Sequence, residues 1–412
     1  MIDVASLRRQ FPALNREREG RLPVFFDGPG GTQTPERVID AIGHYLRTCN
    51  ANHGGAFRTS RESDAVVLSA HQAAADFLNA PSHEETVFGA NMTTLTFHLS
   101  RAIGRTLRRG DVVIVTRLDH DANVSPWVLA ARDAGATVRQ VDIRPEDCTL
   151  DIEDFKRQLS DRTRLVALTC ASNGVGTIND VKSLTALAHE AGAKVFLDAV
   201  HYAPHGLIDV QSWDCDFLAC SAYKFFGPHI GILWGKREWL TELPAYKVRP
   251  SSNALPDRWM TGTQNHECLA GVTAAIDYLA DVASPTSNAD RRSKLRAAMM
   301  AIQSYERALA DRLLDGLAER PQFKVWGIRE KSNRGNRVPT VSITLSDQPA
   351  GAIAEHLASR EIYVWSGNMY ALELTERLGL ENKGGLLRIG LVHYNTPEEI
   401  DRLLTALDDL PR

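Results

Sequence analysis

One lysine stands in an apolar and aromatic stretch where a charged side chain is out of place. Lys224 lies within residues 216–228, and Phe225 and Phe226 follow it directly. Taking an ammonium group out of water is costly, so burial lowers the pKa of a lysine and leaves a neutral amine. A neutral amine is a nucleophile toward aldehydes. Most lone lysines are solvated surface residues, but these neighbours favour a lysine that binds an aldehyde.

An aspartate ends a short apolar segment upstream, at residues 194–198. In a parallel α/β sheet the carboxyl ends of the strands line the ligand crevice. An aspartate there can keep the pyridine nitrogen of pyridoxal 5'-phosphate (PLP) protonated, while a lysine carries the PLP aldehyde as a Schiff base. Asp198 and Lys224 together therefore predict a PLP site. Taken alone, Asp198 is about as readily the N-cap of a helix after a strand.

Three further positions carry groups that such a site needs. Residues 89–94 form a turn into a helix, where free N–H groups and threonine hydroxyls can bind a phosphate. His120 follows a predicted strand and lies on the same rim as Asp198, where an imidazole can stack on a cofactor ring. Arg388 is a charge inside an apolar strand, and its planar fork suits a substrate carboxylate. Each position also has a purely structural alternative. Residues 89–94 could hold a simple threonine N-cap, His120 could be a hydrogen-bonded core histidine, and Arg388 could form an internal ion pair.

The elements that position these groups alternate between strand and helix. Predicted strands cover residues 111–116, 137–143, 164–169, 194–198, 216–221 and 229–235, with a further one at 86–88. Apolar strands with helical crossovers indicate a mostly parallel sheet buried on both faces. A helix from about residue 35 carries Val38, Ile39, Ile42 and Leu46 on one predicted face. The fold class is therefore α/β.

A long helix over 289–320 leads into a second, smaller α+β unit. Its predicted strands are 338–345, 361–365 and 386–391, and its helices are 350–358 and 397–407. We interpret residues 21–285 as a large PLP-binding domain and 286–412 as a small domain. Residues 1–20 are expected to pack with the small domain.

Composition narrows the class of protein. The 412 residues carry a net charge of −4, so nothing favours nucleic acid or an anionic membrane as a partner. No apolar run reaches about 18 residues, so no spanning helix is expected. The six cysteines lack C-x-x-C spacing and indicate a reduced, cytoplasmic protein. The glycine cluster at 28–31 fails as a dinucleotide motif because Gln33 stands where the third glycine should be.

Motifs in a fixed order resemble the class V aminotransferases, and within them the cysteine desulfurase-like enzymes of PLP fold type I. These motifs include Tyr223-Lys224, S-N-G-V-G-T at 172–177 and the segment 386–390, and the resemblance runs from Phe26 to Thr396. It implies a large domain with a seven-stranded sheet, a smaller α+β domain and a homodimer with shared active sites.

The resemblance also implies a role for each matching residue. Lys224 would form the Schiff base, Asp198 would contact the pyridine nitrogen, and His120 would stack on the ring. Asn173 would lie near the ring, His201 would contact the phenolic oxygen, and Thr93, Ser221 and Tyr223 would contact the phosphate, with Met92 beside them. Thr263 would reach the phosphate of the neighbouring subunit. Arg388 would bind the substrate carboxylate, and Trp365, Asn368 and Tyr370 would line the side-chain pocket.

The departures from the family pattern concern the reaction. Cysteine desulfurases carry a nucleophilic cysteine on a loop that corresponds here to residues 364–372, and this loop has no cysteine. Without a thiolate there, no persulfide forms on the loop. Tyr223 replaces a histidine, His201 replaces a glutamine, and Phe57 stands where a second histidine is usual. We therefore expect a divergent subfamily that does not relay sulfur in the usual way.

The expected reaction is a PLP-dependent change at the α-carbon of an amino acid. Related chemistry favours β-elimination of the C–S lyase type, while transamination and epimerisation remain open. A catalytically inactive PLP-fold scaffold is an alternative of another class. A metal hydrolase is weaker still, because Pro204 lies between His201 and His205 and spoils a helical ligand pair.

Overall fold

The computed structural model describes residues 2–283 and 289–410, and its largest element is a seven-stranded sheet, called here the large sheet. Its strand order is β2-β10-β9-β8-β7-β3-β4, and β10 is antiparallel to both of its neighbours while the other pairs are parallel. The strands are β2 (Thr86–Gly89), β3 (Val112–Thr116), β4 (Thr137–Val141), β7 (Thr163–Thr169), β8 (Lys194–Asp198), β9 (Phe217–Ser221) and β10 (Gly231–Gly235). The prediction of a mostly parallel sheet is confirmed.

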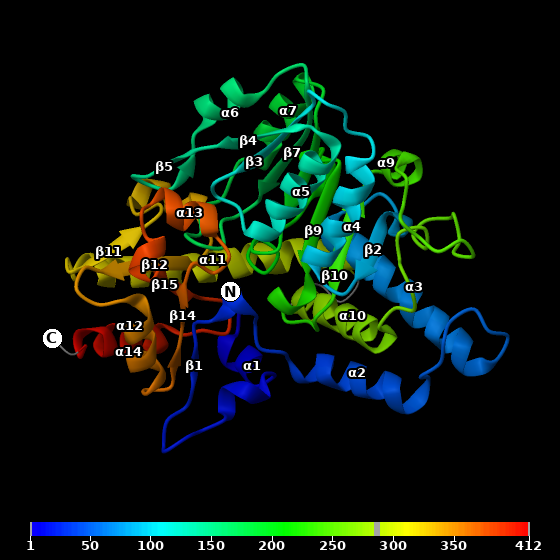
Figure 1. The fold of residues 1–412 in the computed structure, drawn as a ribbon. Coiled ribbons are helices and arrows are strands. Elements are labelled where there is room, and N and C mark those ends of the chain that lie inside the picture. The colour runs from blue at the N-terminus through cyan, green and yellow to red at the C-terminus, as the bar shows by residue number, and fades with distance from the viewer. Residues whose placement is uncertain (1, 284–288, 411–412) are drawn as a thin grey trace.

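Helices cover both faces of the large sheet, as Figure 1 shows. In β8, Val195 and Leu197 face one core and Phe196 faces the other, which explains the unbroken apolar sequence. The first core is completed by α3 (Arg58–Leu78), α7 (Val181–Glu190), α10 (His266–Ala280) and α11 (Arg291–Ala318), with α1 (Val4–Arg8), α6 (Ile152–Gln158) and α8 (Val210–Trp213) also contributing. The second is completed by α4 (Met92–Gly104), α5 (Ser125–Ala134) and α9 (Arg237–Glu242).

A second, antiparallel sheet, called here the small sheet, has the order β11-β12-β15-β14. Its strands are β11 (Phe323–Trp326), β12 (Thr340–Leu345), β15 (Leu386–Gly390) and β14 (Trp365–Gly367). It shares an apolar core with α12 (Ala350–Ala358), α14 (Pro397–Asp408) and the second half of α11. α14 begins with a capping box between Thr396 and Glu399. The predicted α+β unit is therefore present.

Two of the predicted strands are wrong in their extent. The strand expected over 361–365 is divided into β13 (Ile362–Tyr363) and β14, because β13 pairs with β1 (Val24–Phe25) while β14 pairs with β15. The strand expected over 137–143 ends as β4 at Val141, since β5 (Ile143–Arg144) pairs instead with β6 (Thr149–Leu150). β11 and the short helix α13 (Leu372–Arg377) were not predicted. For the two strands predicted over 361–365 and 137–143, the pairing partner, and not the local pattern, decides where the strand ends.

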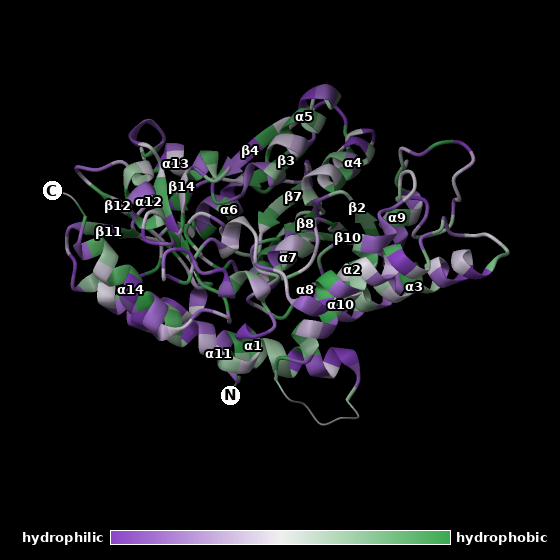
Figure 2. Cartoon of the chain, turned by 90° about the horizontal axis from the view of Figure 1, so that it is seen from below, coloured by the Kyte–Doolittle hydropathy of each residue, from purple (hydrophilic) through white to green (hydrophobic). Residues whose placement is uncertain are grey.

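The first helix of the large unit, α2 (Glu36–Thr48), buries a different face from the one predicted. Val38 and Tyr45 are buried, and Ile42 contacts Gly271 of α10. Ile39 and Leu46 are instead 44% and 49% exposed. Figure 2 shows the mixture of hydrophilic and hydrophobic residues along the helices. The side of α2 that carries Ile39 and Leu46 is left exposed in the single chain.

The N-terminal segment contacts both α14 and the core of the large sheet. The guanidinium group of Arg8 pairs with Glu399 of α14 at 2.7 Å, and Phe11 packs its ring edge-on against Phe226, Tyr278 and Tyr394. The domain limits remain an interpretation, and the boundary at 285/286 falls outside the described residues. Within residues 2–283 and 289–410, no helix has the length and hydropathy needed to cross a bilayer.

Candidate active site

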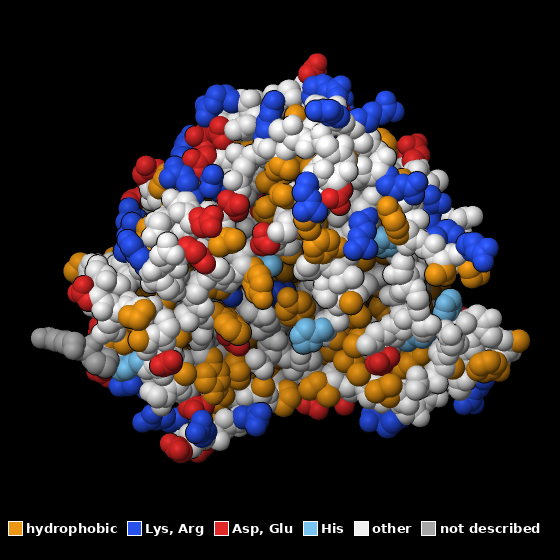
Figure 3. Space-filling view, viewed as in Figure 1, with side chains coloured by type: hydrophobic (Ala, Val, Ile, Leu, Met, Phe, Trp, Pro, Cys, Tyr) orange, Lys and Arg blue, Asp and Glu red, His pale blue; other side chains and the backbone are white. Residues whose placement is uncertain are grey.

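The carboxyl ends of β7, β8 and β9 meet the small sheet around one cavity of about 800 Å³. This is the edge at which α/β sheets bind ligands. Hydrophobic side chains gather around a hollow near the centre of the face seen in Figure 3, where Figure 1 shows the small sheet approaching the large one. The predicted residues that line the cavity are Met92, Thr93, His120, Asn173, Asp198, His201, Ser221, Tyr223, Lys224, Trp365 and Arg388.

Lys224 ends the 3₁₀ turn Ala222–Lys224 that directly follows β9. Its Nζ donates a hydrogen bond to the carbonyl oxygen of Pro29 at 2.5 Å. Burial in the cavity, and then the positive charge of Arg388, lower the pKa of Lys224 to about 7. A substantial fraction of this lysine is therefore a neutral amine near neutral pH, as a nucleophile toward an aldehyde must be.

Asp198 is the last residue of β8, and its side chain is buried. Its Oδ1 accepts a hydrogen bond from the Val200 N–H at 2.8 Å, so Asp198 closes a turn after the strand. Burial raises the pKa of Asp198 to about 6, and Lys224 opposes this rise. A buried carboxylate of this kind gains from a cationic partner in the cavity.

His120 follows β3 and faces the same cavity. Its Nδ1 accepts a hydrogen bond from the Ala122 N–H at 3.0 Å, which leaves Nε2 as the protonated nitrogen of the neutral ring. Burial, and then the positive charges of Lys224 and Arg388, lower the pKa of His120 to about 4. The imidazole is therefore neutral near pH 7 and can stack on a flat ring.

Arg388 lies in the middle of β15 and is only 3% exposed. Its Nη1 donates to the Asn173 carbonyl oxygen at 2.9 Å, and its Nε has no partner. Among the described residues, no carboxylate lies within ion-pair distance of it, so the internal ion pair considered above is absent there. Burial lowers the pKa of Arg388 to about 9, and Asp27 opposes this. Arg388 is thus a buried cation that has no ion-pair partner among the described residues.

The N-terminus of α4 forms the opposite end of the cavity. The Met92 N–H donates to Ser221 Oγ at 3.0 Å, and Thr93 is exposed beside it. Gly231 of β10 permits this approach, since a Cβ on it would lie 2.3 Å from the backbone carbon of Asn91. The helix end and the two hydroxyl groups make a site for an anion such as a phosphate.

Gly231→Ala is expected to displace the N-terminus of α4 and to raise the dissociation constant for PLP by about tenfold or more, because overpacking typically costs about 1–3 kcal/mol. Titration of the cofactor-free protein with PLP measures this change. Gly351→Ala in α12 is the matched control, since no atom lies within 4 Å of its added Cβ. Equal affinities in the two variants would show that this close approach does not shape the anion site.

Two predicted residues lie outside the cavity lining. The side chain of Asn368 donates to Glu381 Oε1 at 2.9 Å, so it is turned away from the place expected for it. Thr263 is exposed in the loop before α10, and its role depends on a neighbouring subunit. Pairing of two chains and the contact of Thr263 therefore stay predictions. Two residues that do line the cavity are also held by protein contacts. The Nε2 of His201 is hydrogen-bonded to Thr340 Oγ1 at 3.0 Å, and the ring of Tyr223 stacks on that of His229 with 4.9 Å between the ring centres.

Sequence reasoning missed groups that lie in the cavity or close beside it. Asp27 follows β1, and its buried Oδ1 has no hydrogen-bond partner. Burial raises the pKa of Asp27 to about 6, against the charges of Arg388 and Lys224. Met369 and the carbonyl group of Pro29 were likewise not among the predicted site groups. Tyr370, which was expected to line the side-chain pocket, does line the cavity. For Asp27, the one local signal in the sequence was a carboxylate directly after the apolar run 24–26.

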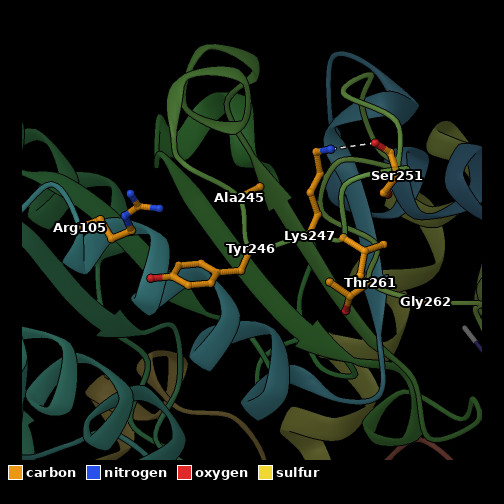
Figure 4. A pocket seen from close by; sticks show the side chains of 8 residues that line it. Arg105, Ala245, Tyr246, Lys247, Ser251, Thr261 and Gly262 are labelled. Carbon is orange, nitrogen blue, oxygen red and sulfur yellow. Dashed lines mark hydrogen bonds between the residues drawn. The ribbon is translucent and has the colours of Figure 1, made fainter.

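A second hollow, of about 440 Å³, lies beside the loop that follows α9 (Figure 4). Lys247 donates to the carbonyl oxygen of Ser251 at 2.7 Å, and Arg105 lies 5.9 Å from the centre of the Tyr246 ring. No carboxylate is among the described residues that line it. It therefore lacks the combination of groups found in the large cavity.

The groups in the large cavity fit PLP. An anion site at the N-terminus of α4, a buried carboxylate at the end of β8 and a lysine with a lowered pKa correspond to the phosphate, the ring nitrogen and the aldehyde. The unpaired polar atoms Asn173 Oδ1 and Arg388 Nε remain for a ligand to satisfy. Within the described chain, no group of three or more His, Cys, Asp or Glu side chains could hold a metal ion.

Comparison with known proteins agrees with this site. The family described as Aminotransferase class-V matches residues 24–403. The chain belongs to the class V aminotransferases. It is 33% identical to the aminotransferase-like protein FGM3 of Gibberella zeae over 417 residues, which cover 98% of each chain. It is 32% identical to a probable cysteine desulfurase of Synechocystis, over 98% of this chain and 94% of that relative.

Solved structures extend the same likeness. The cysteine desulfurase CsdA of Escherichia coli matches with a TM-score of 0.84 and 27% identity over 99% of this chain and 98% of that chain. The cysteine desulfurase of Thermococcus onnurineus matches with a TM-score of 0.86 and 25% identity over the same shares. This class V aminotransferase is thus a PLP-dependent enzyme with the predicted fold, and amino acids are the substrates consistent with its family.

Proposed function

We propose that this enzyme catalyses a β-elimination of the C–S lyase type on an amino acid. The observation that carries the proposal is that Lys224, Asp198 and Arg388 line one cavity, while no cysteine is among the described residues that line it. Cleavage of a C–S bond by elimination needs a base for the α-proton and no thiolate from the protein. Transfer of sulfur to the protein would need such a thiolate.

The proposed roles follow from the position of each side chain. The N-terminus of α4, with Ser221 and Thr93, would hold the phosphate of PLP, and Asp198 would hold the ring nitrogen. Bound there, PLP supplies an aldehyde that reacts with amines and a ring that accepts electrons from the α-carbon. Arg388 would bind the substrate carboxylate through its free donors and so fix which bond at the α-carbon is broken.

Lys224 would then act as the general base. Its lowered pKa suits removal of the α-proton, because a base works best when its pKa lies near the working pH. His120 presents its Nε2–H as a donor, because Nδ1 already accepts a backbone N–H. A donor at this position supports departure of a leaving group and disfavours epimerisation, which needs a second base.

The products test this proposal. With β-substituted amino acids, the wild-type enzyme is expected to release pyruvate and ammonium, measured by enzymatic assays. Transfer of the amino group to an added keto acid would instead show transamination, and inversion at the α-carbon would show epimerisation. Borohydride reduction should attach PLP to Lys224, as detected by peptide mass spectrometry. A protein that takes up no PLP would contradict the whole assignment.

A further inference from the structure

The mouth of the cavity is formed by two aromatic residues on one short segment of the chain. Trp365 begins β14 and lies directly opposite Arg388 in the antiparallel pair β14–β15. Side chains of directly opposed residues project from the same face of a sheet. The indole of Trp365 therefore lies beside the guanidinium group that is proposed to bind the substrate carboxylate.

The indole also contacts the large unit. A Cβ on Gly30 would lie 2.1 Å from the Nε1 of Trp365, so the ring lies against the backbone of the turn Gly28–Gly30. Trp365 is nevertheless 50% exposed. Half of a large aromatic surface is thus held in place at the mouth and remains uncovered, as in sites that bind apolar groups.

Tyr370 forms the second wall. Its ring stacks on His120 at 5.3 Å with an interplanar angle of 25°, and the residue is 71% exposed. Its carbonyl oxygen accepts from the Asp121 N–H at 2.7 Å, and the Met369 carbonyl oxygen accepts from Asn173 Nδ2 at 2.9 Å. These bonds hold the loop against the large unit.

The backbone of this loop is strained. Met369 and Tyr370 have φ angles of 49° and 59°, in the left-handed region that residues with side chains rarely adopt. Such strain persists where the surrounding structure enforces it, and it gathers at functional sites. The hydrogen bonds to Asp121 and Asn173 offset its cost, so Tyr370 is held at the mouth in a fixed position.

The charges of the lining limit what can bind between these walls. Among the described residues that line the cavity, lysine and arginine occur only at positions 224 and 388. Both are assigned, to the aldehyde of PLP and to the α-carboxylate of the substrate. Asp121 lies at the same mouth, and a second negative group on the substrate would meet it without a cation nearby.

From these contacts we infer that the substrate is an S-substituted cysteine whose sulfur carries an uncharged apolar group, aromatic or alkyl, which lies between Trp365 and Tyr370. This inference rests on the proposed elimination. Lys224 takes the α-proton, the Cβ–S bond breaks with its electron pair on sulfur, and the thiolate takes a proton from solvent. The three-carbon fragment takes up one water and leaves as pyruvate and ammonium. No oxidant, reductant or protein thiol is needed.

Binding of two matched amino acids that cannot eliminate tests the specificity apart from the reaction. L-norleucine and L-2-aminoadipate differ only by a methyl group or a carboxylate at the end of the side chain. Dissociation constants from calorimetry on the PLP-loaded enzyme should favour L-norleucine by about tenfold or more, the discrimination typical of apolar pockets. Equal affinity, or preference for L-2-aminoadipate, would overturn the inference even if elimination is observed.

Variants assign the preference to the two aromatic residues. Trp365→Ala and Tyr370→Ala should each lower kcat/KM for S-benzyl-L-cysteine by about tenfold and weaken L-norleucine binding in parallel, while L-alanine binding changes less than about twofold. Tyr370→Phe keeps the ring and should match the wild type. Tyr246→Ala, an exposed tyrosine outside this cavity, is the matched control. If the wild type releases no pyruvate but still prefers L-norleucine, the elimination fails while the apolar mouth stands. If both alanine variants keep the preference, the assignment to these walls is wrong.

Discussion

Replacing Lys224 with alanine is expected to abolish covalent attachment of PLP and to lower turnover by about 10³-fold or more, since a positioned base alone contributes about 10²–10⁴-fold. The side chain directly follows β9 and is held by the Pro29 carbonyl oxygen. Its pKa of about 7 reflects burial and the neighbouring Arg388. Borohydride reduction followed by mass spectrometry measures attachment, and release of pyruvate measures turnover.

Two further variants separate this role from a general loss of charge. Lys224→Arg keeps a cation in the cavity but offers no amine that can react with the aldehyde, so it should fail as the alanine variant does. Lys331→Ala removes an exposed lysine paired with Asp315 and should behave as the wild type. Retention of borohydride-fixed PLP in Lys224→Ala would place the attachment at another lysine and remove the basis of the assignment.

Asp198→Asn is expected to retain PLP yet lose about 10²–10³-fold in turnover, the size seen when one preorganised electrostatic contact is removed. Asparagine has the same shape, and its side-chain oxygen can still accept the Val200 N–H. What it lacks is the negative charge that keeps a ring nitrogen cationic, and without that charge the ring withdraws electrons less strongly. Cofactor content and kcat are measured on the same preparation.

The comparison with Asp198→Ala completes this test. Alanine removes both the charge and the turn hydrogen bond, so its PLP content should fall below that of the asparagine variant. Turnover near the wild-type value in Asp198→Asn would contradict contact with the ring nitrogen. Loss of PLP in both variants, with turnover per bound PLP unchanged, would assign Asp198 to the shape of the turn alone.

Residues that end or follow strands of a parallel sheet could be placed from the sequence. Asp198, Lys224 and His120 belong to this class, because parallel strands bring their carboxyl ends to one edge whatever their order. Arg388 was found for a different reason, as a cation within an apolar strand that requires an anion. These four side chains line the same cavity.

The rest of the site depends on contacts that no local pattern contains. Asp27 comes close enough to influence the pKa values of Lys224 and Arg388 because β1 pairs with β13, which lies more than 300 residues further along the chain. Tyr370 covers His120 because its loop bonds to Asp121 and Asn173. Asn368 is drawn away by Glu381, which lies beyond α13. Thr263 depends on a second chain, whose position the sequence of one chain does not contain.

The meeting of the first and last strands has a consequence for how the enzyme acquires its vitamin-derived group during synthesis. The Gly390 N–H donates to the Phe26 carbonyl oxygen at 2.8 Å, and the Asn395 side chain donates to the Phe25 carbonyl oxygen at 3.0 Å. During synthesis the segment around Phe25 is made first, while its partners Gly390 and Asn395 are made near the end of translation. We therefore expect the nascent chain to take up no PLP until its C-terminal part has left the ribosome.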